Sequence, residues 1–375
     1  MSQSPRVSIR ECFSQLTDPR RRKVVYPLVN VVTIAVCAVL CGADDFVAIA
    51  RFGRAKLAWL SRFLDLSAGI PSHDRFNAIF AALRVNEFQE CLLELITALH
   101  EVTDGQVVAI DGKTLRRSFD RATGKSAIHM VSAWASANHI SLGQVVVDEK
   151  SNEITAIPKL LQLLELSGAL VTIDAMGCQV DIARAIVDGG GDYVLAAKNN
   201  QPTIAQAIDA YFAEHAQDNF SRVDVRRHVT HDKGHGRQER REYVIGRVPE
   251  GLPDRSRWPN LVAIGMVFVC AFRDGKEHLE CRYYILSKYL SAKRFAQAVR
   301  DHWSIENRLH WQLDVTFQED QCRIRKGNAD ANFSALRRTA LSLLKNNHSE
   351  KIGIKNKRLL AALDDDYLQE VLFGN

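Results

Sequence analysis

Residues 107–114 read VVAIDGKT, and residues 170–177 read LVTIDAMG. Each stretch is a short apolar run that ends in Ile-Asp, at Asp111 and at Asp174. Such a run predicts a strand that is buried on both faces, with the chain turning just after the aspartate. Two buried carboxylates in one sheet repel each other and raise each other's pKa. We therefore expect a divalent cation to neutralise them.

The periodicity of apolar residues predicts four segments in this chain of 375 residues. Residues 1–104 have helical spacing and predict an all-helical N-terminal domain. Residues 105–200 predict three strands in a meander, then alternating helices and strands, as in a mixed α/β sheet. Residues 201–290 predict a β-rich insertion. Residues 291–375 return to a helical pattern, which includes Glu306.

The net charge of the chain is small, but its basic residues are concentrated in a few segments. The net charge is +5, with hydrophobic and charged contents ordinary for a globular protein. Basic residues outnumber acidic ones in 219–260 and 294–345, and residues 20–23 read RRRK. Local basic charge of this kind indicates a partner that carries phosphates. The eight cysteines form no Cys-x-x-Cys pair, which favours reduced thiols and a cytoplasmic location.

The apolar segment 24–42 follows the basic run and has the length of a membrane span. Pro27, Asn30 and Thr33 interrupt it, and two aspartates follow directly. We therefore predict a buried core helix and no membrane association.

A third acid stands in residues 300–311, which read RDHWSIENRLHW. On an α-helix, His302, Glu306 and His310 would share one face, flanked by Trp303 and Leu313. A lone Glu among apolar neighbours is more often part of a structural ion pair. Together with Asp111 and Asp174, however, Glu306 is favoured as a third carboxylate of one site.

Three carboxylates favour Mg²⁺ or Mn²⁺, which prefer oxygen ligands. The alternative is zinc bound by the histidines of the same helix. His302 and His310 lie about 12 Å apart along the helix axis, so they cannot bind one ion together. Two ions held by Asp, Asp and Glu would activate a water or a 3′-hydroxyl and stabilise the leaving oxygen of a phosphodiester.

The chain resembles bacterial insertion-sequence transposases of the DDE class, in the group that contains the H-repeat-associated proteins of Rhs elements. The resemblance covers nearly the whole chain. Its motifs are AIDGK at 109–113, IDAMGCQ at 173–179, KNNQ at 198–201, HGR at 235–237 with Glu239 and Arg241, and HWSIEN at 302–307 with LHWQLDV at 309–315.

The resemblance implies a ribonuclease-H-like fold and a catalytic triad of Asp111, Asp174 and Glu306, with two Mg²⁺ or Mn²⁺ ions. It also implies that the N-terminal helical domain binds the ends of the element. Many relatives place Tyr, Arg and Lys at fixed offsets around the catalytic Glu. This chain has Val299, His302 and Leu313 there, so Arg300 or Arg308 is a candidate for contacting phosphate.

We expect a DNA transposase that cuts at its terminal inverted repeats and joins the freed 3′-hydroxyl to target DNA, as a homodimer or larger assembly. The alternatives are a ribonuclease-H-like nuclease that does not join strands, and a non-catalytic DNA-binding protein derived from a transposase. Trp303 either packs in the core or stacks on an unpaired base. The candidate DNA contacts are Lys113, Gln179, Lys198, Asn199, Arg237, His302, Trp303 and Arg308.

Overall fold

The structure is a computed structural model that describes residues 9–21, 24–99, 106–119, 126–147, 152–234, 237–273 and 276–374. Arg22 and Lys23 of the basic run and the dipeptide 235–236 lie outside these ranges. The chain forms two compact units. The sheet unit comprises Asp104–Asp111 and Lys150–Ile305, and the helical unit comprises Met1–Thr103, Gly112–Glu149 and Glu306–Asn375.

The sheet unit begins with parallel strands that the apolar runs predict. β4 (Leu170–Ile173) pairs in parallel with β1 (Val107–Thr114) on one side and with β5 (Asp192–Ala197) on the other. Every residue of β4 is buried, as expected for a strand covered on both faces. Helix α7 (Glu153–Leu161) directly precedes β4, and helix α8 (Val180–Asp188) connects β4 to β5. The predicted mixed α/β sheet is confirmed, and its ribonuclease-H-like character stays a prediction.

The predicted β-rich insertion continues the same sheet. Antiparallel β9 (Lys276–Leu286) pairs with β5, and β8 (Ala263–Arg273), β7 (Arg237–Arg247) and β6 (Val225–Gly234) follow in that order. A short 3₁₀ turn, η1 (Arg255–Arg257), lies between β7 and β8.

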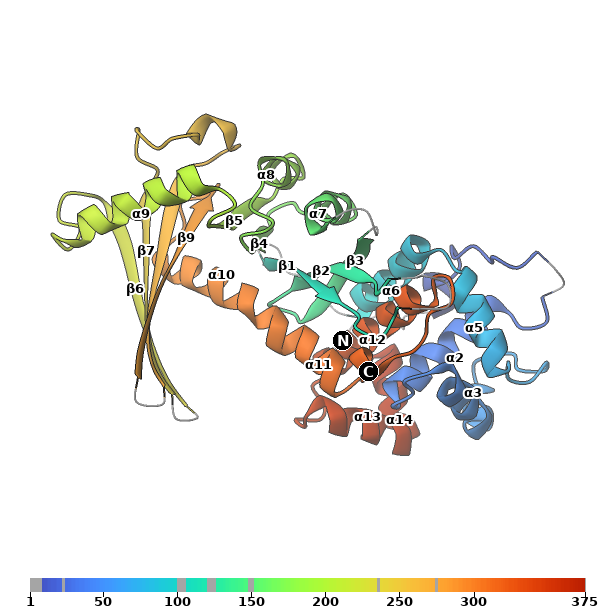
Figure 1. Cartoon of the computed structure of the whole chain (residues 1–375). Helices are drawn as coiled ribbons and strands as arrows, with labels where there is room; N and C mark the ends of the chain where they lie inside the picture. The colour runs from blue at the N-terminus through green and yellow to red at the C-terminus, as the bar shows by residue number, and fades with distance from the viewer. Residues whose placement is uncertain are drawn as a thin grey trace, which may run out of the picture. The chain divides into compact units, whose positions relative to one another are not determined.

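Two helices cover opposite faces of this extension (Figure 1). Tyr283 stacks on Phe212 of α9 (Pro202–Ala216), whereas the next residue, Tyr284, meets Phe295 of α10 (Ala292–Ile305) edge to face. Because successive side chains of a strand point to opposite faces, α9 and α10 lie on different sides of β9.

The helical unit joins both ends of the chain. Helices α1 (Ile9–Cys12), α2 (Leu28–Leu40), α3 (Phe46–Ala55), α4 (Leu57–Leu60), α5 (His73–Ala82) and α6 (Val85–Leu99) come from the N-terminal part. They pack with α11 (Trp311–Val315), α12 (Ala329–Asn346), α13 (Ile354–Leu363) and α14 (Asp365–Phe373). The hairpin of β2 (His129–Ala135) and β3 (Ile140–Val147) belongs to this unit.

The units divide the chain differently from the predicted segments 1–104, 105–200, 201–290 and 291–375. The N-terminal helices share one unit with 306–375, because α12 packs against α2, α5 and α6. Asn332 of α12 strengthens this packing: its Nδ2 donates to the carbonyls of Phe80 and Leu83, 2.8 and 3.1 Å away, at the end of α5. Such long-range contacts leave no periodic signal in the sequence.

The apolar segment 24–42 forms α2, whose residues from Asn30 to Leu40 are buried. The prediction of a core helix is therefore confirmed. In the described part of the chain, no helix is both long enough and apolar enough to cross a membrane.

A buried arginine ties the C-terminal helices to the end of α2. Arg358 of α13 is only 5% exposed, and its Nη2 donates to the Val39 carbonyl at 3.1 Å and to Asp44 Oδ1 at 2.9 Å. The guanidinium also lies 4.1 Å from the centre of the Phe317 ring. The Arg358 side chain thus donates hydrogen bonds both to a carbonyl at the C-terminus of a helix and to a carboxylate.

Replacement Arg358→Met is expected to lower the free energy of unfolding by about 3 kcal/mol, because it leaves Asp44 and the Val39 carbonyl without their donor. Urea unfolding monitored by circular dichroism measures the change. The matched control is Arg51→Met on the exposed face of α3, which should stay within about 0.5 kcal/mol of wild type. Equal losses in the two variants would contradict this role for Arg358.

Candidate active site

Two of the three predicted carboxylates are brought together by neighbouring strands. In the parallel ladder, Val107 pairs with Leu170 and Ile110 pairs with Ile173. The next residues are Asp111 and Asp174, so the two aspartates stand side by side on neighbouring segments about 4.8 Å apart. Asp174 directly follows β4, whereas Asp111 lies within β1. Both side chains are half-buried. Their adjacency confirms the expectation that one sheet carries both acids, but the turn predicted directly after Asp111 is wrong, because β1 continues to Thr114.

The turn after β4 orients Asp174. Its Oδ1 accepts hydrogen bonds from the backbone N–H groups of Met176 and Gly177, at 3.1 and 3.2 Å. A Cβ at Gly177 would come within 2.3 Å of Ile173 Cγ2, so only glycine permits this tight turn. Burial raises the pKa of Asp174, while the Gly177 N–H lowers it. Both bonds go to Oδ1, which leaves Oδ2 as the oxygen that is available to a cation.

Side chains of the KNNQ motif support the same turn. Asn200 Nδ2 donates to the carbonyl of Ala175, and Gln201 Nε2 donates to the carbonyl of Cys178 at 3.0 Å. Gln179, a predicted DNA contact, is half-buried and donates to the Met176 carbonyl at 3.3 Å. Asn200 and Gln201 belong to the KNNQ motif, but the sequence did not indicate that they support this turn.

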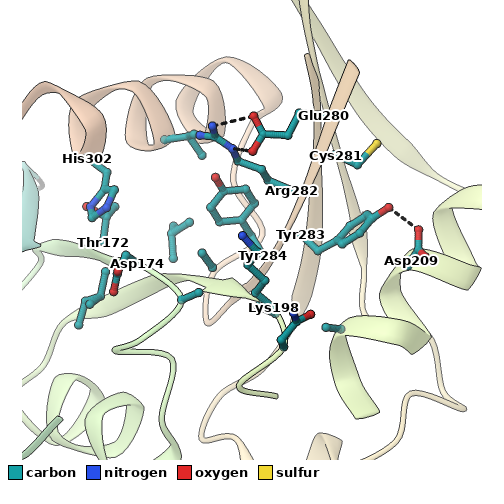
Figure 2. A pocket seen from close by; sticks show the side chains of 18 of the residues that line it. Thr172, Asp174, Lys198, Asp209, Glu280, Cys281, Arg282, Tyr283, Tyr284 and His302 are labelled. Atoms are coloured by element: carbon teal, nitrogen blue, oxygen red, sulfur yellow. Dashed lines mark hydrogen bonds and ion pairs between the residues drawn. The ribbon is translucent and has the colours of Figure 1, made fainter. Parts of the chain in front are cut away.

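A pocket of about 400 Å³ opens beside Asp174 (Figure 2). Four of the predicted residues line it together with Asp174: Lys198, Asn199, His302 and Trp303. Lys198 and Asn199 are exposed. The pocket thus brings a carboxylate, a cation and aromatic surface together within the sheet unit, although these residues come from 174 to 303 in the sequence.

β9 supplies lining residues that the sequence did not indicate. Arg282 pairs with both carboxylate oxygens of Glu280, at 2.7 and 2.9 Å, and its guanidinium lies 4.6 Å from the centre of the Trp303 ring. Tyr283 donates its hydroxyl to Asp209, as Figure 2 shows. Trp303 is 41% exposed, so the alternative that it only packs in the core is wrong. Its exposed ring is available to stack on a planar ligand.

His302 lies beside Thr172 in this pocket and is held neutral (Figure 2). Burial lowers the pKa of His302 to about 4, and the charge of Arg282 acts in the same direction, while the Thr172 backbone opposes both. A neutral imidazole can contact DNA only as a hydrogen-bonding group and not as a cation.

The single α-helix predicted through residues 300–311 is interrupted. The α-helix α10 ends at Ile305, and Glu306–His310 form a π-helical segment, η2. Glu306 is exposed, not surrounded by apolar side chains. Burial and the charges of Arg338 and Lys113 lower the pKa of His310 to about 3.

Lys113 is a buried member of an ion-pair network in the helical unit. It is 9% exposed, and its ammonium contacts Asp314 and lies 3.1 Å from Glu319 Oε2. Glu319 Oε1 in turn accepts from Arg338 Nη1 at 3.0 Å and from Ser334 Oγ at 2.7 Å. Burial raises the pKa of Glu319, but the nearby cations hold it well below its usual range. A direct contact of Lys113 with DNA would require both ion pairs to open.

The other predicted DNA contacts have separate positions. Arg237 begins β7, and its side chain lies outside the described part. Arg300, one candidate for contacting phosphate, pairs with Asp232 Oδ2 at 2.8 Å. Arg308 is exposed in η2, two residues after Glu306. Of the two arginines, only Arg308 is free of a carboxylate partner among the described residues.

The described residues include no group of three or more His, Cys, Asp or Glu side chains arranged to hold a metal ion. The sheet unit provides two carboxylates, Asp111 and Asp174, and Glu306 belongs to the helical unit. The convergence of all three carboxylates stays a prediction.

Comparison with known families gives the class of the protein. The family described as "Transposase DDE domain" matches residues 102–343, and the "DDE_Tnp_1-associated" family matches residues 10–96. The first match alone spans more than half of the chain and includes the strand ends and pocket described above. The chain belongs to the DDE transposase family.

Individual relatives agree with this assignment. The chain is 41% identical over 372 residues to the Escherichia coli O157:H7 protein named "Putative transposase YncI", covering 97% of this chain and 94% of the relative. It is 38% identical over 373 residues to the "H repeat-associated putative transposase YhhI" of Escherichia coli strain K12, covering 98% of each. The resemblance that the sequence motifs indicated is therefore confirmed.

Among solved structures, a piggyBac transposase in a synaptic complex with hairpin DNA is similar over 96% of this chain and 76% of that one. The sequence identity is 10% and the TM-score is 0.43. At this distance the likeness carries no argument about the site.

The neutral His302 predicts a loss of stability in acid. Its folded pKa of about 4 lies below the ordinary value of 6.5, so the unfolded chain binds the proton first as the pH falls. The free energy of unfolding should therefore fall between these two pH values, by up to about 3 kcal/mol from this residue.

Urea unfolding at both ends of this pH window tests the contribution, with His302→Gln as the variant. The variant should lose less stability than wild type on acidification, whereas His278→Gln, at an exposed position of β9, should behave as wild type does. The same acid sensitivity in His302→Gln and wild type would show that His302 is not the source.

Proposed function

We propose that this protein is an active transposase that cuts DNA at the terminal inverted repeats of its own element and joins the 3′ ends to target DNA. The proposal rests chiefly on the side-by-side placement of Asp111, within β1, and Asp174, directly after β4. Glu306 is the proposed third carboxylate, brought to the same site when the protein is bound to DNA.

The two aspartates suit Mg²⁺ or Mn²⁺. Both present carboxylate oxygens, which these ions prefer, from half-buried positions on neighbouring segments. Asp174 Oδ2 is oriented by the two backbone bonds to Oδ1. Two bound ions would supply Lewis-acid chemistry for phosphodiester cleavage and transfer.

The residues around Asp174 have separate tasks in this proposal. Asn200 and Gln201 hold the turn so that the carboxylate keeps its direction. Lys198 offers a cation to a phosphate at the pocket rim, and Asn199 offers an exposed amide. The exposed Trp303 ring, backed by Arg282, provides a stacking surface for an unpaired base.

The remaining roles follow from what the reaction requires. Both ends of an element must be processed together, so we propose a homodimer or a larger assembly on DNA. We propose that the N-terminal helices bind the terminal repeats. Gln179 and Arg237 are further candidate DNA contacts, whereas the ion pairs of Lys113 favour a supporting role for that residue.

Replacement of any proposed ligand should abolish strand transfer while the protein still binds DNA. Asp111→Asn, Asp174→Asn and Glu306→Gln are each expected to slow joining about 1,000-fold or more, because metal-held charge contributes several kcal/mol. The assay uses pre-cut element ends, target DNA and Mg²⁺. Asp188→Asn at the exposed end of α8 is the matched control and should keep wild-type activity.

The same assay separates the alternative functions. Hydrolysis of the ends without a joined product would favour a nuclease that does not transfer strands. Binding of the ends with no cleavage by wild type would favour a non-catalytic DNA-binding protein. Wild-type joining by Asp174→Asn would contradict the assigned chemistry directly.

The exposed ring of Trp303 predicts a selective DNA-binding defect. Trp303→Ala should weaken binding to DNA with unpaired terminal bases by about 10-fold, in line with about 1–3 kcal/mol per stacked base, and leave duplex binding unchanged. Fluorescence anisotropy measures both affinities. Trp311→Ala is the control, since Trp311 is 53% exposed but belongs to the helical unit. Equal losses for paired and unpaired ends would contradict the stacking role.

A further inference from the structure

Three basic side chains gather around Trp134 in the helical unit. Arg308 Nη1 lies 3.3 Å from His139 Nε2, and the His139 ring stacks on Trp134 with centres 6.1 Å apart. Lys345 Nζ lies 5.4 Å from the centre of the same indole. We call Arg308, His139 and Lys345 the basic cluster. Its members come from η2, the β2–β3 turn and α12.

Of the buried bases described in this unit, three have carboxylate partners, whereas Arg337 and Lys357 donate to backbone carbonyls. Lys113 and Arg338 pair with Glu319, and Arg358 pairs with Asp44. By contrast, no ion pair joins any member of the basic cluster to a carboxylate in the described part of the chain. Cations placed together without an acid repel one another and lose hydration.

Electrostatics within the cluster agree with this geometry. Burial, and then the charge of Arg308, lower the pKa of Lys345 to about 8. Burial lowers the pKa of His139 to about 4, with contributions from Lys345, Arg308 and His348. At neutral pH the cluster therefore presents two cations and one neutral imidazole. An anion with several oxygens would remove the repulsion and accept hydrogen bonds from both cations.

We propose that the basic cluster binds a phosphate group of the DNA backbone, next to the position of Glu306. The inference rests on the proposed function, because it takes DNA as the source of the phosphate. Arg308 supports it: it stands two residues after Glu306, so a phosphate held there would fix the strand beside the third carboxylate. Lys345 would add a second positive charge. The Trp134 ring would support Lys345 and His139.

The thermal stability of Lys345→Met distinguishes a ligand-binding role of Lys345 from a purely structural one. If the Lys345 ammonium served only to stabilise the fold through its contact with the Trp134 ring, its removal would destabilise the protein. If instead the repulsion is maintained for ligand binding, Lys345→Met should melt at the wild-type temperature or above, since methionine keeps most of the apolar stem.

The first arm of the test uses inorganic phosphate with the full-length protein. The probe is the indole N–H resonance of Trp134, assigned with Trp134→Phe, at constant ionic strength set with chloride. Wild type should show a saturable shift that Lys345→Met and Arg308→Gln each lose. Lys355→Met, on the exposed surface of α13, is the matched control and should keep it.

The second arm uses a duplex of the element end and distinguishes DNA from free phosphate. In Lys345→Met, the slope of log affinity against log salt should fall by about one, as expected for the loss of one phosphate contact. A phosphate shift without any change in this slope would overturn DNA as the ligand. No saturable shift in wild type, or equal shifts in all variants, would overturn the site itself.

The first arm requires no catalysis, so its outcome is independent of the strand-transfer assay. If phosphate binds but no joining occurs, the proposed function fails and the anion site stands. If joining occurs but phosphate does not bind, the site fails and the proposed function stands.

Discussion

The in-register pairing of β1 with β4 is the constraint on which the account of the site depends. Because Ile110 stands opposite Ile173, Asp111 and Asp174 come next at the same level of the two neighbouring strands. A shift of one residue would turn one of these side chains to the other face of the sheet. The register is set by buried strands, so the stability of the core and the geometry of the acids have the same origin.

Polar contacts of side chains hold the segments that follow the two aspartates. Glu319 joins Lys113, two residues after Asp111, to Arg338 of α12. Within the sheet unit, Asn200 and Gln201 hold the turn that follows Asp174. Each network uses side chains that are far apart in sequence and leaves few alternatives for the backbone between them. Among the described residues no carboxylate pairs with the basic cluster, and for this reason we propose it as a ligand site.

Sequence patterns predicted the strands, the core helix 28–40 and the adjacency of the two aspartates, because apolar runs and their ends are local signals. They did not predict the π-helical turn at Glu306, where Leu309 is buried and Glu306 exposed, since tertiary packing rather than periodicity decides that geometry. Nor did they predict that Lys113 pairs with Glu319, 206 positions away. Such contacts depend on the fold, and a single sequence does not report them.

The central claim is that the carboxylates of Asp111, Asp174 and Glu306 hold metal together on DNA. The most direct measurement replaces Mg²⁺ with Fe²⁺ in the DNA complex and adds ascorbate and peroxide. Radicals then cleave the polypeptide backbone near the bound iron. The account predicts cleavage at all three positions, lost together in Asp174→Asn. Cleavage near Asp111 and Asp174 that spares the segment around Glu306 would contradict it.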